Sequence, residues 1–429
     1  MTSIDAPVTY RGLFDVPGFR RIAAATVVAR TGSAMQALVL VLFVLARFHS
    51  PPLAGVVVFL SIVPGLVISP LAGALLDRHR RMLLIRSDYV LAAASLVLLV
   101  GLDASGRLPA AVLLPVVAVA SLTNPLSNSG TRSLFPMMVP RALWDRANAV
   151  DSGAYVIASI AGPALAGLVF GVWGARAALL LTALLFALGF ALLLLVAEPV
   201  MERTATGSLG ADALAGLRYV LRHRQLRGIA VATGVLNIGF GILNLGLPVL
   251  LLSQLRVGAA SVGAMYAVMG VAGLVATLLA GRIPSERREA RFIVLGCVLS
   301  ALAMAIILVA AGIGGGLIVV AIAMAVFGVS QGPYDIGMFS LRQRVTPAPW
   351  MGRAFAVSMS LNFIGMPIGS VIAGPVVDRS RPAAFAGAVL VDVLAAVAAA
   401  VMLRRRPSAE AIVSGRRVQS GAQPRLFND

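Results

Sequence analysis

The sequence predicts an all-α, polytopic membrane protein in which twelve transmembrane helices form two pseudo-symmetric six-helix bundles. Three observations carry this prediction. Hydrophobic residues make up 59% of the 429-residue chain and charged residues only 12%, which is about half the charge of a typical soluble domain. Apolar runs of membrane-spanning length recur along the chain. The second half also repeats short motifs of the first half at a nearly constant offset.

A helix needs about 20 mostly apolar residues to cross the hydrocarbon core of a bilayer. Twelve runs of this length are separated by polar segments, most of them short. Residues 1–21 contain no early apolar core, so the first span itself is expected to act as the insertion signal. The predicted spans are 22–46, 54–76, 82–101, 108–130, 148–171, 177–197, 227–254, 259–281, 292–312, 315–338, 354–377 and 383–403.

All 35 basic residues are arginine, and their distribution predicts the orientation. With both termini in the cytoplasm, 28 arginines fall on the cytoplasmic side and 6 on the opposite side, while Arg30 lies inside the first span. Basic residues collect in cytoplasmic loops. We therefore expect a multi-pass protein of the cell (plasma or inner) membrane with both termini cytoplasmic. The net charge of +18 then reflects topology and contact with membrane lipid, and no nucleic-acid partner is expected.

Residues of the first half recur 207 positions later, as in Arg146 with Arg353 and Gly162 with Gly369. A duplicated six-span unit is the simplest explanation. The expected domains are an N-terminal bundle at 1–197, a central cytoplasmic loop at 198–226, a C-terminal bundle at 227–403 and a cytoplasmic tail at 404–429.

The central loop contains one amphipathic stretch. Leu214, Leu217 and Leu221 share a face at helical spacing, which is typical of a helix lying on the inner membrane surface. The alternative is that the segment only spaces the two halves.

A charged stretch, Gly73-Ala-Leu-Leu-Asp-Arg-His-Arg-Arg81, lies between the second and third spans and is expected to form a loop. It resembles the loop between spans 2 and 3 of the major facilitator superfamily, whose fold also has twelve spans, a six-plus-six repeat and a long central loop. Two stretches resemble a branch of twelve-span drug/proton antiporter-like exporters that includes siderophore and macrolide efflux proteins. They are the Asp-Arg-x-Arg-Arg variant of this motif at residues 77–81 and the stretch at residues 134–149. The matching residues are Gly73, Leu75, Asp77, Arg78 and Arg81.

The resemblance implies that this stretch is a gate. In the family, its Asp contacts the start of a helix in the other half. For Asp77 that start lies at 352–356, where the helix dipole favours an anion. The acids that Arg78 and Arg81 would hold are Asp145 and Asp151.

A second signature lies in the fifth span, where Gly162, Pro163 and Gly167 resemble the Gly-Pro motif of drug/proton antiporters. Pro163 leaves a backbone carbonyl without its helical partner, and the glycines let another helix approach closely. The alternative is that these are ordinary residues of a membrane helix. Such antiporters often carry an Arg in the fourth span, and residues 108–130 contain none.

The resemblance implies that spans 1, 4, 7 and 10 line a central substrate cavity. An intramembrane Arg costs at least about 2.5–3.5 kcal/mol on insertion scales, so Arg30 must face a wet cavity or a partner. It binds an anionic or polar group of the substrate, modulates a nearby acid, or bridges two helices. The amides either bind substrate or join helices. The candidate cavity residues are Arg30, Gln36, Asn124, Asn128, Asn237, Asn244, Gln331 and Tyr334.

Two acids are candidates for proton coupling. Asp335 lies in the tenth span, where a carboxyl group that alternates between dry and wet surroundings can take up and release a proton. The alternative is that it caps or latches a helix. Asp392, in the twelfth span, is the rival, although the family places that helix at the periphery.

These observations together predict a secondary active transporter. The single cysteine, Cys297, excludes an intramolecular disulfide and a cysteine metal cluster, and no phosphate-binding Gly-Lys-Ser/Thr loop is present. We expect no enzyme activity, no cofactor and no metal. The expected function is proton-coupled efflux of a small amphipathic or drug-like molecule by a monomer using alternating access. An importer or facilitator on the same fold, or a non-transporting membrane sensor or scaffold, stays open as an alternative.

Overall fold

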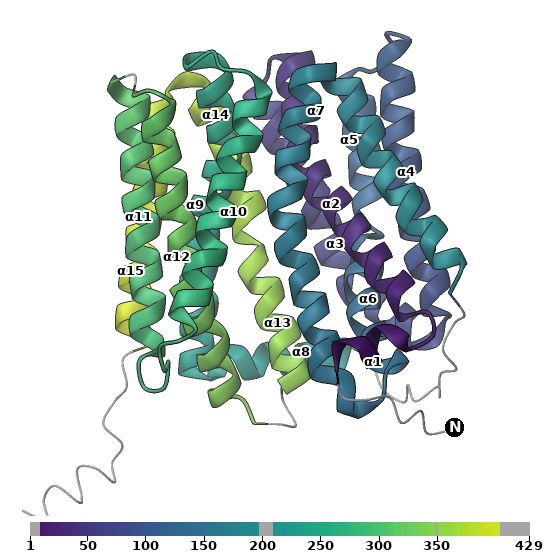
Figure 1. Cartoon of the computed structure of the whole chain (residues 1–429). Helices are drawn as coiled ribbons and strands as arrows, with labels where there is room; N and C mark the ends of the chain where they lie inside the picture. The colour runs from purple at the N-terminus through teal and green to yellow at the C-terminus, as the bar shows by residue number, and fades with distance from the viewer. Residues whose placement is uncertain (1–8, 197–208, 314, 348–350, 404–429) are drawn as a thin grey trace, which may run out of the picture.

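The computed structural model describes residues 9–196, 209–313, 315–347 and 351–403, and across these residues the regular structure is helical, with no strand (Figure 1). Eleven of the described helices are long and apolar enough to cross a membrane. One of them, α7 (Trp144–Leu194), has 51 residues, about 75 Å at the helical rise. Its backbone leaves the helical region at Gly174, with φ 81° and ψ −179°, where the chain folds back. The predicted twelve spans are therefore confirmed.

The first six spans pack against one another as one bundle. Ser50 caps the second long helix by accepting a hydrogen bond from the Leu53 N–H at 3.2 Å. The elements are α1 (Tyr10–Asp15), α2 (Phe19–Phe48), α3 (Pro51–Arg78), α4 (Arg81–Ala104), α5 (Ala110–Ser121), α6 (Asn124–Met138), η1 (Arg141–Leu143) and α7.

The second six spans follow a helix in the central segment. Pro248 lacks an N–H, and shortly after it the helix widens into a π-helical turn. The elements are α8 (Leu209–Arg222), α9 (Arg224–Val249), η2 (Leu250–Gln254), α10 (Ala259–Ala280), α11 (Glu289–Ile313), α12 (Leu317–Val345), α13 (Met351–Phe363), α14 (Gly365–Arg379) and α15 (Arg381–Met402).

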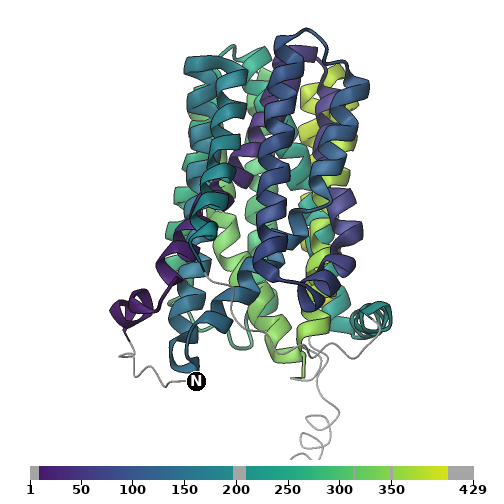
Figure 2. The same cartoon turned by 90° about the vertical axis from the view of Figure 1, so that its right-hand side faces the viewer.

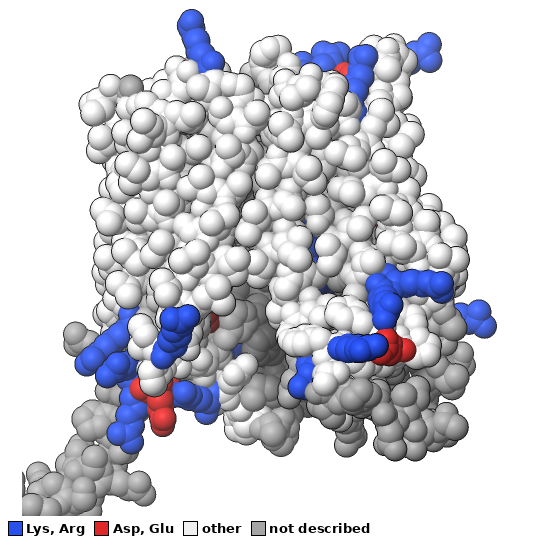
Figure 3. Space-filling model, in the orientation of Figure 1, with Lys and Arg blue, Asp and Glu red and all other residues white. Residues whose placement is uncertain are grey.

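The helices α1 and α8 mark one end of the molecule, which we call the α8 end; the opposite end is the far end. Figure 1 shows α8 from the side, whereas Figure 2 shows it along its axis, so it lies across the ends of the spans. It buries Val220 and leaves Leu214 and Leu221 about half exposed. Charged side chains gather at both ends, with a broad uncharged band between them on the face shown in Figure 3.

Two boundaries differ from the sequence prediction. The expected loop at 73–81 is wrong, because α3 continues through Arg78 and only His79 and Arg80 separate it from α4. A helix satisfies its own backbone groups, and long arginine side chains can reach out of the apolar zone. The fourth span breaks between α5 and α6 just before Pro125, and then continues to Met138, well beyond the predicted end at residue 130.

The two halves meet along two helix pairs, α7 with α10 and α3 with α14. A methyl group at Gly167 would stand 2.5 Å from the Gly263 nitrogen, and one at Gly374 would stand 2.7 Å from the Pro52 Cα. Backbones approach this closely only where side chains are absent. Since Pro52 and Gly374 lie near the far-end termini of their helices, these contacts close the far end.

Candidate functional site

An ion pair crosses the first bundle between α2 and α7. The Arg30 Nη2 donates to the Asp151 Oδ1 at 2.6 Å, and its Nη1 donates to the Asp151 backbone oxygen at 2.7 Å. The guanidinium also lies 3.8 Å from the centre of the Tyr155 ring, a cation–π distance. Arg30 is only 7% exposed. These contacts are those of a bridge between two helices.

A second arginine joins this pair from α6. The Arg132 Nε lies 3.6 Å from the Asp151 Oδ2, and its guanidinium lies 4.8 Å from the centre of the Tyr155 ring. Its side chain is 56% exposed, whereas those of Arg30 and Asp151 are buried. We call Arg30, Arg132, Asp151 and Tyr155 the arginine cluster. It holds two cations and one carboxylate, so it carries one surplus positive charge on an accessible arginine.

Arg132 also corrects the sequence reading of the fourth span. The sequence predicts no arginine there, because its apolar run ends at residue 130. The helix continues to Met138 and therefore includes Arg132. Arg132 and Tyr155 lie 23 positions apart on different helices, and the sequence carries no signal that pairs them. Only the correct end of α6 could have placed Arg132 in the fourth span. Asp151, proposed as a partner for the 73–81 arginines, is engaged by Arg30 and Arg132 instead.

Three of the predicted cavity residues hold helices together. The Asn237 amide donates to the Asn362 backbone oxygen at 3.0 Å and thereby joins α9 to α13. The Tyr266 hydroxyl donates to the Asn244 Oδ1 at 2.7 Å. The Tyr334 hydroxyl donates to the Thr233 Oγ1 at 2.6 Å. Each bond stays within the second bundle, which fits the interhelical alternative for these groups.

The four remaining amides of the predicted cavity set make no side-chain hydrogen bond to another described helix. Gln331 reaches only its neighbour Ser330, at 3.4 Å. Gln36 and Asn124 are partly exposed, and Asn128 is exposed on α6, one turn before Arg132. These four amides keep their hydrogen-bonding capacity for water or a ligand.

The two candidate acids differ in their surroundings. Asp392 is 0% exposed and accepts a hydrogen bond from the Ser300 Oγ at 2.6 Å, so α15 is joined to α11. Its Oδ1 faces Gly239 of α9 and has no hydrogen-bond partner among the described residues. Asp335 on α12 is partly exposed and makes no hydrogen bond or ion pair with any residue that the structure describes. Asp335 is therefore the acid that solvent or a ligand can reach.

Comparison with known proteins identifies the family. A sequence model of the Major Facilitator Superfamily matches residues 22–370. The chain belongs to this superfamily. It is therefore a multi-pass membrane protein and a membrane transporter, as the sequence predicts, and not an enzyme.

Three major facilitator relatives show the extent of the similarity. The uncharacterized MFS-type transporter y4rN of Sinorhizobium fredii is 36% identical over 399 residues, which cover 92% of this chain and 97% of that protein. The macrolide efflux protein A of Streptococcus pyogenes is 20% identical over 367 residues, covering 84% and 89%. The crystal structure of the nucleoside transporter NupG matches with a TM-score of 0.71 at 15% identity, covering 90% and 99%, which shows the shared fold.

The Gly-Pro signature of this superfamily member lies at two close helix crossings. A methyl group at Gly162 would stand 2.5 Å from the Ala34 Cβ on α2, within the first bundle. Gly167 meets Gly263 of α10, and a methyl group at Gly263 would stand 2.6 Å from the Pro163 backbone oxygen. The signature therefore sits where α7 touches the opposite half.

The predicted gate is only partly visible. Several parts of the gate lie outside the described residues. They are the side chains of Asp77, Arg78, Asp145 and residues 351–356, together with the surroundings of Gly73. Arg81 is described: its Nε donates to the Leu76 backbone oxygen at 3.1 Å, and its Nη1 lies 3.0 Å from the Met137 Sδ. Arg81 thus ties the end of α3 to α6.

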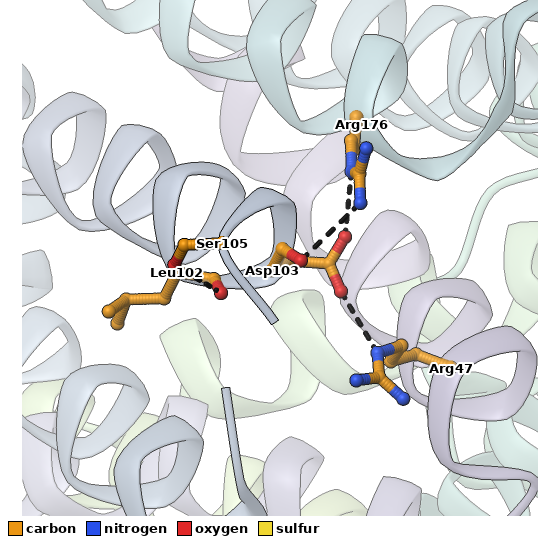
Figure 4. A network of polar contacts seen from close by, with 5 residues as sticks. All are labelled: Arg47, Leu102, Asp103, Ser105 and Arg176. Atoms are coloured by element: carbon orange, nitrogen blue, oxygen red, sulfur yellow. Dashed lines mark hydrogen bonds and ion pairs between the residues drawn. The ribbon is translucent and has the colours of Figure 1, made fainter. Parts of the chain in front are cut away.

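A second charged site, which sequence analysis did not single out, lies at the far end of the first bundle (Figure 4). Asp103 on α4 accepts from the Arg47 Nε at 3.0 Å and from the Arg176 Nε at 2.8 Å. The Asp103 side chain is 8% exposed, and each arginine is about half exposed. We call these three residues the far-end clamp, because they join α2, α4 and the second arm of α7.

Proposed function

We propose that this transporter exports a small amphipathic or drug-like molecule in exchange for protons, by alternating access between its two halves. In this proposal the α8 end faces the cytoplasm, as the excess of arginine there favours, and the far end faces outward. The observation that carries the proposal is Asp335: an accessible acid, unpartnered among the described residues, on a helix that the family places along the cavity.

An aromatic pair between α9 and α12, the helix of Asp335, supports an amphipathic substrate. The partly exposed Phe240 on α9 stacks on the buried Phe327 of α12 with ring centres 5.7 Å apart, so Phe240 presents aromatic surface. Across the molecule, Asn128 and Arg132 offer an amide and a cation. A ligand site of this kind combines apolar walls with a few polar groups that fix orientation. The efflux activity named for the Streptococcus pyogenes relative supports export as the direction.

The arginine cluster supports a further preference. Because Asp151 already satisfies Arg30, the surplus charge lies on Arg132. A substrate with an anionic or strongly polar group would gain a charge-assisted hydrogen bond there. Arg132, rather than Arg30, is therefore the proposed substrate-facing cation.

The test begins with a toxicity screen of matched strains with and without the protein. A compound to which the protein confers resistance is then followed in proteoliposomes under an imposed proton gradient. We expect uptake against the compound's own gradient only while the proton gradient lasts. Transport that proceeds equally after the proton gradient is collapsed would refute proton coupling, and sensitisation rather than resistance in cells would favour import.

A further inference from the structure

A cavity at the far end lies just outside the contact that closes the two halves. Its volume is about 600 Å³, within the range of about 300–1,000 Å³ found for small-molecule sites. Both halves form its walls, with Ala46 and Phe170 from the first and Leu252 from the second. Phe170 lies one turn of α7 beyond Gly167, and Ala259 at the start of α10 and Val377 near the end of α14 also line the cavity.

The walls of this cavity are mostly apolar. Ser253 also lines it, with its hydroxyl donating to the Val249 backbone oxygen of its own helix, and so do three ionisable side chains. They are His49 at the end of α2, Asp378 in the last turn of α14 and Arg381 at the start of α15. None of them makes a hydrogen bond or ion pair with a described residue. Asp378 and Arg381 carry opposite charges yet do not pair with each other. The cavity therefore presents one free cation and one free anion beside an apolar chamber.

The Arg381 guanidinium gives the strongest indication of a ligand. Its Nε is buried and has no acceptor among the described residues. A buried donor that loses its hydrogen bond to water costs free energy unless a partner replaces it. A ligand oxygen placed in the cavity would supply that partner, and a charge-assisted bond to guanidinium is stronger than a neutral one.

We propose that this far-end cavity is a second binding site, separate from the central transport cavity, for a zwitterionic amphipathic molecule. The apolar tail lies against Ala46, Phe170 and Leu252. The anionic part of the head accepts a hydrogen bond from Arg381, and its cationic part lies near Asp378. Because the ligand touches both halves in the closed arrangement, it binds that arrangement best and opposes opening of the far end.

The test uses octylphosphocholine, a water-soluble zwitterion with a single short tail, and the full chain in lipid nanodiscs. Its binding is followed by titration calorimetry, with empty nanodiscs as the reference for partition into lipid. We expect saturable binding of one molecule per chain. Arg381→Ala should weaken the affinity about tenfold or more, and Ala46→Phe should abolish binding by filling the chamber.

Arg379→Ala is the matched control, because Arg379 is an exposed arginine two positions away that does not line the cavity. It should bind as the unmodified chain does. The proposal is overturned if octylphosphocholine gives no saturable signal beyond that of empty nanodiscs. It is equally overturned if Arg381→Ala and Ala46→Phe both bind with unchanged affinity.

Discussion

Closure of the far end depends on the absence of a side chain at Gly167. The Cβ of any larger residue would stand 2.5 Å from the Gly263 nitrogen and 2.6 Å from the Ala259 backbone oxygen. These neighbours are backbone atoms of α10, so they cannot rotate away as a flexible side chain would. We predict that Gly167→Val disfavours the closed far end while leaving each bundle folded.

The size of the effect follows from the contact. Overpacking a close interface typically costs about 1–3 kcal/mol. If the strain is felt only when α7 meets α10, this cost acts on the equilibrium between closed and open states and shifts it about 5–150-fold. Gly153→Val is the matched control on the same helix, since a methyl group at Gly153 meets no atom within 4 Å.

The assay is a distance distribution between spin labels placed across the far end. Arg107→Cys and Arg379→Cys supply exposed labelling sites in the two halves, and Cys297→Ser removes the only native cysteine. In this background, Gly167→Val should move population from the short to the long distance, whereas Gly153→Val should leave the distribution unchanged. An unchanged distribution in folded Gly167→Val protein would refute the closure argument.

Three further predictions concern the charged sites. Asp151→Asn should lower the free energy of unfolding by about 3 kcal/mol in denaturant unfolding, because it leaves Arg30 buried without its counter-ion. The double variant with Arg30→Gln should recover part of the loss. If the stability losses of the two single variants simply add in the double variant, the pairing is contradicted. Arg132→Gln should raise the KM for an anionic substrate about tenfold with little loss of stability, since the contact of Arg132 with the Asp151 carboxylate is long and exposed. Arg132→Lys should restore most of the affinity. An equal rise in the KM for a neutral substrate would count against a charge interaction. Asp103→Asn should lower the free energy of unfolding by about 1–2 kcal/mol, because it weakens two charge-assisted hydrogen bonds at the far end. If the loss of stability is the same at high salt as at low salt, its origin is not electrostatic.

Much of the fold could be predicted because membrane helices are long and apolar. The expected span at 259–281 differs from α10 by a single residue, and the predicted central helix appears as α8. The glycine signature at Gly167 pointed correctly to a close helix approach, since only a missing side chain permits one. Ends of helices were harder: both α3 and α6 extend through arginines, because the helical backbone stays satisfied after the apolar run has ended.

The candidate site was less predictable, because its partners are distant in sequence. Arg30 required a partner on physical grounds, but nothing in the chain singled out Asp151, 121 residues away. The polar stripe of Asn237 and Asn244 suited substrate binding or helix contacts equally well, and only the packing shows that both amides contact neighbouring helices. The far-end clamp was missed for the same reason, since Arg47, Asp103 and Arg176 meet only after three helices are assembled.

The central proposal is that Asp335 carries the proton that drives export. The most direct measurement follows the pH inside proteoliposomes with a trapped dye while a gradient of the transported compound is imposed. We predict that the unmodified protein moves protons opposite to the compound. The Asp335→Asn variant should still move the compound down its gradient, without any change in internal pH. Asp392 is the matched acid and accepts a hydrogen bond from Ser300, and the Asp392→Asn variant should keep the coupled pH change. Movement of the compound by the unmodified protein with no change in internal pH, or a coupled change that survives Asp335→Asn, would contradict the proposal.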